Sequence, residues 1–263
     1  MQCKSRKIDK EEWLISVLTA QRLQNYRELD RGTNYFRAQM TTLREKYSDD
    51  GHLLWLGKVL WASLCYRLVN LIETFQSFGG IPEACDETIF IKSIKKQMNK
   101  GKAVFTGAHQ NMGLLRYQKT IKYVAKSLEK LAKGVFEANS DHDLEQCYLV
   151  INDIDNVGPF FAWQVTCDLM ECACLSNCTE NDYAKLGNGA IKGIKILFGD
   201  NYTKEDQQLE LAKVLHKIQD QVFDDLQVSF PRFEGRELTV KNIEHALCEF
   251  NKYDAVQGKL RKR

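Results

Sequence analysis

The most apolar stretch of the chain, residues 53–72, is interrupted by Lys58, Arg67 and Asn70. Arg67 and Asn70 are three residues apart, which would place them on one face of a helix. Burying an arginine without a partner is costly, so Arg67 should face either a carboxylate or a cleft that takes a phosphate. This pair is therefore the first candidate for a functional site.

A carboxylate that could meet Arg67 occurs much later in the chain. Asp168 follows Gln164 by four residues, which puts both side chains on the same face of a helix. Asp168 is a candidate general base, or it holds a buried polar network. A structural Arg67–Asp168 ion pair is the plainer alternative, and it would still make the two residues neighbours.

A short motif before Asp168 has the pattern of a tight turn between two helices. Its residues are Ile154-x-Asn156-Val157-Gly158-x-x-x-Ala162. This is similar to the helix-hairpin-helix consensus, in which a left-handed turn residue precedes a helix whose first N–H groups can hold a phosphate. Asn156 replaces a consensus glycine, and Asp153 and Asp155 would repel a phosphate. An ordinary pair of helices with a Gly-Pro turn is the alternative.

Two further segments combine glycine with polar residues. A loop over residues 105–113 contains His109 and Gln110, and polar groups with a function gather in loops. In the second segment, Lys185 and Asn188 flank Gly187, where backbone amides could approach a phosphate. A solvated histidine and a simple glycine turn are the plainer interpretations of these segments.

Cysteine spacing does not favour a metal centre. The four clustered cysteines are Cys167, Cys172, Cys174 and Cys178. On a continuous helix Cys172 would point about 140° away from Cys167, so the four thiols could converge only if the helix ended first. We therefore expect neither zinc nor an iron–sulfur cluster here. The odd total of nine cysteines indicates reduced thiols and an intracellular protein, in the nucleus or the cytoplasm.

The near-neutral net charge of +2 conceals a strong polarity along the chain. Residues 92–133 contain eleven basic residues and one acidic residue, whereas residues 134–182 contain ten acidic residues and no basic one. Six of the basic residues repeat at helical spacing, and we call them the basic stripe: Arg116, Lys119, Lys122, Lys126, Lys130 and Lys133. A charge run is usually a solvated face, but a single-sign stripe of this length indicates a polyanionic partner.

These residues must be positioned by helices. With 3 Pro and 16 Gly among 263 residues, the chain is poor in turns, and apolar residues recur at helical spacing. We predict an all-α protein with a single helical domain over residues 1–263 and no membrane span. The predicted helices begin with one from Trp13 and continue over residues 34–47, 53–78, 87–100, 114–136, 141–153, 158–176, 181–198, 204–225 and 237–252. The hairpin covers residues 149–176, the basic helix 114–136 and a basic tail 259–263.

Four sequence blocks, in order, resemble a family of helical proteins that act in DNA base hypermodification. The blocks are Tyr66-Arg67-Leu68-Val69-Asn70 with Phe78-Gly79-Gly80-Ile81-Pro82; Phe105-Thr106-Gly107-Ala108-His109-Gln110; Val157-Gly158-Pro159-Phe160-Phe161-Ala162-Trp163-Gln164; and Leu186-Gly187-Asn188-Gly189-Ala190 with Gly193. The family comprises alpha-glutamyl/putrescinyl thymine pyrophosphorylases and the helical domain attached to 5-hydroxymethyluracil DNA kinases. The resemblance implies a two-lobed helix-hairpin-helix fold like that of DNA glycosylases.

The resemblance also implies an activity, in which an amine displaces pyrophosphate from an activated 5-hydroxymethyl base. A base modified within a duplex must be flipped into a pocket. Catalytic candidates are Asp168, Arg67, Gln164, His109 and Asp182. Base-pocket candidates are Phe160, Phe161, Trp163, Asn70 and Gln110, although such an aromatic run more often belongs to a core. DNA-binding candidates are Asn156, Gly158, Lys119, Lys122, Lys126, Lys185 and Asn188.

Two other functions stay open at this point. One is a DNA glycosylase that acts on a modified base, and the other is a DNA-binding or scaffold module without catalysis. No G-x-x-x-x-G-K-[ST] sequence occurs, so the chain is not itself a P-loop kinase, but it could be the helical partner of a base kinase. The expected partner is DNA, and the sequence does not indicate an oligomeric state.

Overall fold

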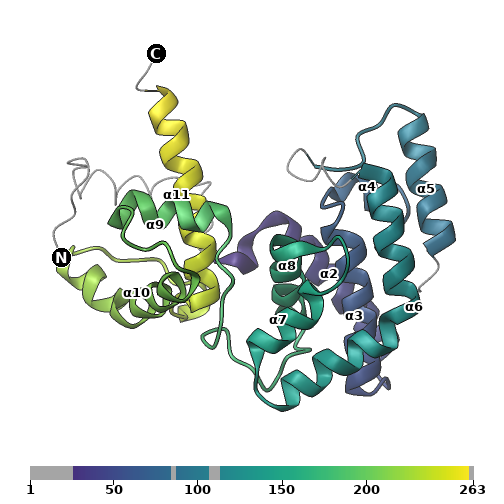
Figure 1. Ribbon diagram of the computed structural model, residues 1–263, viewed down its shortest axis with the longest axis horizontal. Coiled ribbons are helices and arrows are strands. Elements are labelled where there is room, and N and C mark those ends of the chain that lie inside the picture. Colours follow the sequence, from purple (N-terminus) through teal and green to yellow (C-terminus); the bar gives the residue numbers. More distant parts are fainter. Residues whose placement is uncertain (1–25, 84–86, 107–112, 261–263) are drawn as a thin grey trace. The chain divides into compact units, whose positions relative to one another are not determined.

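The computed structural model describes residues 26–83, 87–106 and 113–260 (Figure 1). Within these ranges all regular secondary structure is helical and no strand occurs, which confirms the all-α prediction. None of the described helices combines the length and the apolar character needed to cross a bilayer. The chain divides into two compact units, residues 31–179 and residues 1–30 with 180–263, and each is described by itself below.

Some predictions lie outside the described residues. The helix that begins at Trp13 is one of them, and the loop residues His109 and Gln110 are others. The side chains of the basic tail, residues 259–263, also lie outside the description.

The unit formed by residues 31–179 is built around one buried helix. Its helices are α2 (Arg31–Lys46), α3 (His52–Arg67), α4 (Ile72–Gln76), α5 (Glu87–Asn99), α6 (Gly113–Ser140), α7 (Leu144–Asn152) and α8 (Gly158–Glu171). The side chains of α3 are buried from residue 59 to residue 67, and the helix packs against α2, α6 and α8. A helix that is apolar all round is stable only when other helices surround it, as they do here.

The predicted helix over residues 53–78 is wrong in length, because the chain turns sharply at Asn70. α3 ends at Arg67, and Asn70 has a left-handed backbone with φ of 52°. Its N–H donates to the carbonyl of Tyr66 over 2.6 Å, and α4 then starts at Ile72. Asparagine tolerates the left-handed conformation better than most residues, so this polar residue ends the helix.

The neighbouring helices follow the expected pattern more closely. α6 extends from the predicted 114–136 to Ser140, with Ile121, Val124 and Val135 buried on one face. α7 has Asp143 as its N-cap, and the Asp143 carboxylate accepts the N–H of Gln146 over 2.8 Å.

The second unit has fewer helices. Its described elements are η1 (Arg27–Leu29), α9 (Asn188–Phe198), α10 (Glu205–Asp225), η3 (Phe233–Gly235) and α11 (Val240–Leu260). α9 and α11 pack closely, because Gly193 has no side chain to overlap the backbone of Leu247 (Figure 1).

The predicted helix over residues 181–198 is wrong in its start, because α9 begins only at Asn188. The preceding residues serve α11 instead: the Asn181 side chain accepts the N–H of Val240 over 3.0 Å, and the Glu180 carbonyl accepts that of Lys241. This segment therefore satisfies N–H groups at the start of another helix rather than forming its own.

Candidate functional site

The expected Arg67–Asp168 pair is present and almost fully enclosed. Arg67 Nε donates to Asp168 Oδ2 over 2.8 Å, and Arg67 Nη2 donates to Asp168 Oδ1 over 2.6 Å. Arg67 is 2% exposed and Asp168 is fully buried. Two parallel bonds between a guanidinium and a carboxylate fix the orientation of both groups, so α3 and α8 are locked together at this point.

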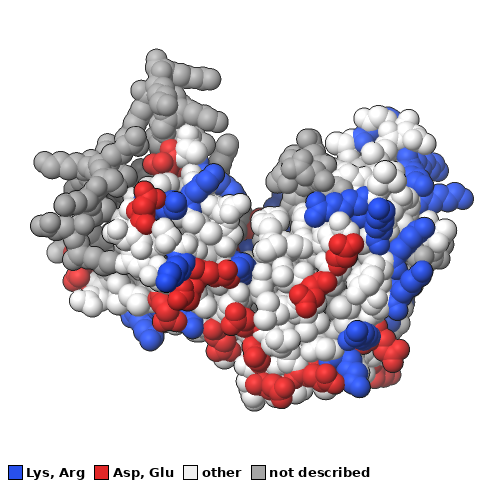
Figure 2. All heavy atoms as spheres, in the orientation of Figure 1, with Lys and Arg blue, Asp and Glu red and all other residues white. Residues whose placement is uncertain are grey.

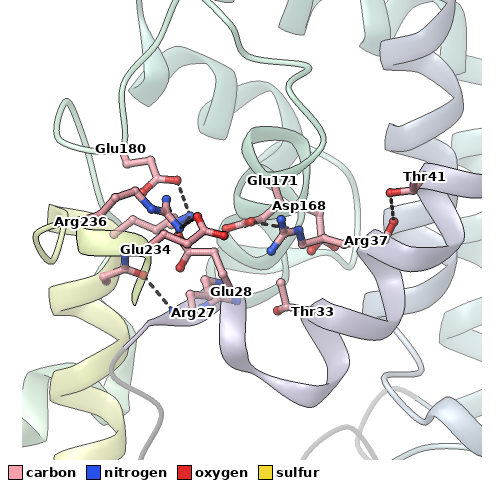
Figure 3. Close-up of polar contacts among 12 residues, drawn as sticks. Arg27, Glu28, Thr33, Arg37, Thr41, Asp168, Glu171, Glu180, Glu234 and Arg236 are labelled. Atoms are coloured by element: carbon pink, nitrogen blue, oxygen red, sulfur yellow. Dashed lines mark hydrogen bonds and ion pairs between the residues drawn. The ribbon is translucent and has the colours of Figure 1, made fainter. Parts of the chain in front are cut away.

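Three more polar side chains complete this centre. The Ser63 hydroxyl donates to Asp168 Oδ2 over 2.6 Å, and Arg67 Nη2 also donates to the Thr33 hydroxyl over 3.1 Å. Arg67 Nη1 lies 3.4 Å from Asn70 Oδ1, which joins the two residues first singled out in the sequence. Figure 3 shows Asp168 and Thr33 in this arrangement. Both Asp168 oxygens accept bonds, so the carboxylate holds Arg67 in place.

The start of the loop that follows α5 lies beside this centre. The N–H of Thr106 donates to the carbonyl of Val69 over 3.2 Å, one residue before Asn70. The sequence block over residues 66–82 therefore contacts Thr106, in the described part of the block that begins at Phe105.

The aromatic residues at the start of α8 have different environments. Phe160 is 52% exposed, Phe161 is half-buried, and their rings meet edge to face with centroids 5.4 Å apart. Trp163 is 2% exposed and belongs to the core. Gln164 is half-buried, one helical turn before Asp168. Phe160 is therefore the most exposed of these three rings.

The turn between α7 and α8 contains two residues with a left-handed backbone. Asn156 has φ of 67° and Gly158 has φ of 70°, so both adopt the left-handed conformation. Arg116 Nη2 donates to the Asn156 carbonyl over 3.1 Å, and the Thr120 hydroxyl lies 3.3 Å from the Asp155 carbonyl. The turn is thus attached to the first turns of α6, where the basic stripe begins.

All six side chains of the basic stripe are exposed along α6. Lys133 lies 3.9 Å from Glu137, and the other five have no carboxylate within ion-pair distance among the described residues. Lys92, Lys95 and Lys96 on the neighbouring α5 are exposed as well. Figure 2 shows Lys and Arg gathered over α5 and α6. Basic residues therefore outnumber acidic ones along α5 and α6, which favours binding of a polyanion.

The acidic segment that follows is largely surface. Exposed members within this unit are Glu137, Asp141, Asp143, Glu145, Asp153 and Asp155. Asp155 accepts a bond from the Asn156 amide over 2.8 Å, so its charge lies directly at the hairpin turn. A phosphate at this turn would meet that carboxylate as well as Arg116.

The clustered cysteines do not share one position in space. Within the described part of the chain, no three thiols come close enough to ligate a common ion. The Cys147 thiol donates to the Val135 carbonyl over 3.7 Å, and burial above all, with a smaller effect of the nearby Cys178, raises the pKa of Cys147 above its usual range. Burial likewise raises the pKa of Cys174 to about 12, so these thiols are protonated and poorly nucleophilic at neutral pH.

Three sequence-predicted residues fall in the other unit. Asp182 is exposed, Lys185 forms an ion pair with Glu205, and Asn188 is the exposed first residue of α9. The amide of Gly187 lies 3.4 Å from the Glu244 carboxylate, so a negative group already occupies this turn.

Sequence reasoning missed a second buried charged centre, in this unit. Lys241 is fully buried, and its Nζ lies 2.6 Å from Glu180 Oε1 and 3.9 Å from Glu28 Oε1. The Thr239 hydroxyl donates to Glu180 Oε2 over 2.9 Å, and Arg236 Nη1 lies 3.2 Å from Glu28. Figure 3 shows Glu180, Glu28 and Arg236 around this group. The sequence contained a hint of this centre, because Lys241 directly follows Val240, the first residue of the apolar repeat of α11.

Comparisons with known proteins give one family. The family model described as "5-hmdU DNA kinase, helical domain" matches residues 4–260, nearly the whole chain. No curated protein and no solved structure matches the chain.

Proposed function

The chain belongs to the family of 5-hmdU DNA kinase helical domains, a family of DNA base hypermodification, and from this premise we propose that it binds DNA and acts on a flipped thymine or 5-hydroxymethyluracil derivative. Its role is that of a transferase on an activated base or of the helical partner of a base kinase. We also propose the two-lobed helix-hairpin-helix architecture of DNA glycosylases as the framework for this role. A modified base within a duplex must leave the stack before a protein can act on it.

The observation that carries the proposal is the basic stripe and its attachment to the hairpin. From Arg116 to Lys133 the stripe extends over about 25 Å at 1.5 Å per residue, roughly the length of seven base pairs. Its side chains are exposed, and Arg116 joins it to the turn at Asn156. Lysines on one face bind phosphates without regard to sequence, while a hairpin turn fixes the register of the backbone.

We assign the base-binding role to the start of α8. Phe160 is exposed next to the hairpin and can stack on a base or occupy the gap that a flipped base leaves. Gln164 lies one turn further along the same helix and can bond to a base edge. In this proposal the enclosed Arg67–Asp168 pair positions α8, and Asn70, whose Oδ1 lies 3.4 Å from Arg67 Nη1, is a further base-binding candidate.

The remaining predicted residues stay candidates. His109 and Gln110 belong to the segment after Thr106, and Asp182, Lys185 and Asn188 belong to the second unit. The non-catalytic alternative has one observation in its favour: both oxygens of Asp168 are already bonded, which leaves this carboxylate committed to Arg67.

DNA binding is tested by retention on a duplex at rising salt. Each phosphate that the protein neutralises adds about 0.9 to the steepness with which log affinity falls against log salt. Lys119→Gln with Lys126→Gln should therefore make this slope shallower by about 2. The matched control replaces Lys192 and Lys217, two lysines of the other unit, with glutamine and should leave the slope unchanged. Retention that ignores salt, or an equal change in the control, contradicts DNA binding by the stripe.

The chemistry is tested separately with DNA that contains 5-hydroxymethyluracil. Because the chain has no P-loop of its own, this DNA is supplied both unactivated and as the pyrophosphate ester of the 5-hydroxymethyl group, each with and without amines, so that an amine can displace pyrophosphate, and the nucleosides are then analysed by mass. A new adduct supports the transferase, and a free base would identify a glycosylase instead. Binding without any change of the nucleosides would leave the scaffold module.

A further inference from the structure

The unit formed by residues 31–179 contains a cleft lined by charged and polar side chains, which the DNA-binding proposal does not involve. It lies between α2, the start of α3 and the end of α8, with a volume of about 580 Å³. That volume is within the range of small-molecule sites. None of its lining residues belongs to the basic stripe, and all of them lie in one unit.

The charged group that dominates this cleft is the guanidinium of Arg44. It lies over the ring of Trp55, 5.0 Å from the ring centroid, and Trp55 is 6% exposed. Arg44 Nη1 donates to the carbonyls of Tyr47 and Asp50 over 3.4 and 3.3 Å. Stacking on an aromatic ring and bonding at one nitrogen hold the guanidinium in a fixed orientation before any ligand arrives.

No carboxylate neutralises Arg44 among the residues that the structure describes. The nearby Glu171 pairs with Arg37 instead, at 3.6 Å from Arg37 Nε, and its side chain is 4% exposed. Glu45 also lines the cleft and is exposed to water, which screens its charge. The lining arginines and glutamates are equal in number, and Arg44 is the lining arginine that has no ion pair within the described residues.

The remaining groups of the lining do not oppose an anion. Burial raises the pKa of Cys172, so its thiol is neutral at physiological pH. His52 donates from Nε2 to the Cys174 carbonyl over 2.9 Å. Arg37 and Arg44 are seven residues apart on α2, two helical turns along one face, so both guanidinium groups line the same cleft (Figure 3 shows Arg37 with Glu171).

We propose that this cleft binds the oxyanion group of a small molecule, with the N–H groups of Arg44 as its principal contact. A planar guanidinium offers two parallel donors to either a phosphate or a carboxylate. Phosphate esters and carboxylic acids both carry oxygens that can accept these two parallel bonds, so the ligand belongs to one of these two classes. The site goes beyond the proposed DNA-binding function and does not depend on it.

Calorimetric titration of the full chain with three probes tests the site: inorganic phosphate, a deoxynucleoside monophosphate and L-glutamate. We expect saturable binding of at least one, and the preferred probe identifies a phosphate or a carboxylate source. Arg44→Gln should weaken that binding about 10- to 100-fold, because it removes the charge-assisted bonds. Arg31→Gln is the matched control on the same helix, since Arg31 is exposed and pairs with Glu73, and it should bind as wild type does.

Two results would overturn the proposal. One is the absence of saturable binding by all three probes, and the other is undiminished binding by Arg44→Gln. Urea unfolding of each variant checks the fold, and Arg44→Lys, which keeps the charge but removes the fork, should bind with intermediate affinity. Retention of DNA by Arg44→Gln should equal that of wild type, so failure here is distinct from failure of the DNA-binding proposal.

Discussion

The two units each enclose a charged centre, and the two centres are built differently. In residues 31–179 a guanidinium meets one carboxylate through two bonds, and both partners are at most 3% exposed. In the other unit the amine of Lys241 has Glu180 and Glu28 nearby, and the Glu180 side chain is 26% exposed. The first centre is thus a fully enclosed arginine–aspartate pair. In the second centre a buried ammonium group has a carboxylate partner that water can still reach.

This difference shows what each centre contributes. A bidentate pair has a defined geometry and no spare charge, so it fixes two helices and aligns whatever lies beside it. An ammonium group between two carboxylates has no such directional constraint, and water can share one of its partners. The closed pair should therefore depend more strongly on both of its members. The following predictions test that contrast, from the largest effect to the smallest.

Asp168→Asn should have the largest effect. The substitution preserves the size of the side chain but leaves Arg67 buried without a counter-charge, so the free energy of unfolding should fall by about 3–5 kcal/mol. Urea unfolding measures the decrease. The double variant Arg67→Met with Asp168→Leu should recover part of it, because an apolar pair needs no desolvation of charge. Equal destabilisation of the single and double variants would contradict a buried ion pair.

Lys241→Met should cost less, about 2–3 kcal/mol, although Lys241 itself is fully buried. The reason is that Glu180 can turn to water, and Glu28 keeps Arg236 as a partner. The same urea measurement applies. A decrease as large as that of Asp168→Asn would show that the second centre is as closed as the first.

His245, on the same helix as Lys241, should make stability depend on pH. Burial, and then the positive charge of Arg27, lower the pKa of His245 to about 3. In the unfolded chain the pKa of histidine is near 6.5. Below that pH the unfolded chain therefore binds a proton at His245, whereas the folded chain does not. Stability from this residue is therefore present above about pH 6.5 and decreases toward pH 3, by about 2 kcal/mol between pH 7 and pH 5.

Urea unfolding of wild type and His245→Phe at pH 7 and pH 5 isolates this contribution. The carboxylates titrate alike in both proteins, so the difference between the two pH responses belongs to His245. Identical responses would show that the imidazole of His245 takes up a proton between pH 7 and pH 5 in the folded chain as it does in the unfolded chain.

The Lys119→Gln and Lys126→Gln double variant should have the smallest effect on stability, within about 0.5 kcal/mol of wild type. These lysines are exposed and unpaired within the described residues, so unfolding changes their surroundings little. Thermal unfolding beside the DNA measurement would show this. A large destabilisation would mean that the stripe packs against protein rather than facing solvent.

Much of the fold follows from local patterns in the sequence. The amphipathic repeat of α6, the Asp143 cap and the all-α class were predictable because helix signals act within a few residues. The late start of α9 was not, since it depends on a bond to a distant segment, from the Val240 N–H to Asn181, and the break at Asn70 was missed although asparagine tolerates the left-handed conformation. The left-handed turn at Asn156 was predictable, because few residues adopt that conformation.

The sequence by itself determined that a buried arginine needed a partner, that a helix would expose a row of lysines, and that a turn would form at Asn156 and Gly158. Those conclusions rest on residue type and helical spacing, which act locally. The sequence offered Asp168 as a candidate partner, but only the tertiary structure decided that it is the partner, that Lys241 has Glu180, and that Arg44 lines a cleft. These are contacts between segments far apart in the chain, and desolvation makes them strong only when folding removes the surrounding water.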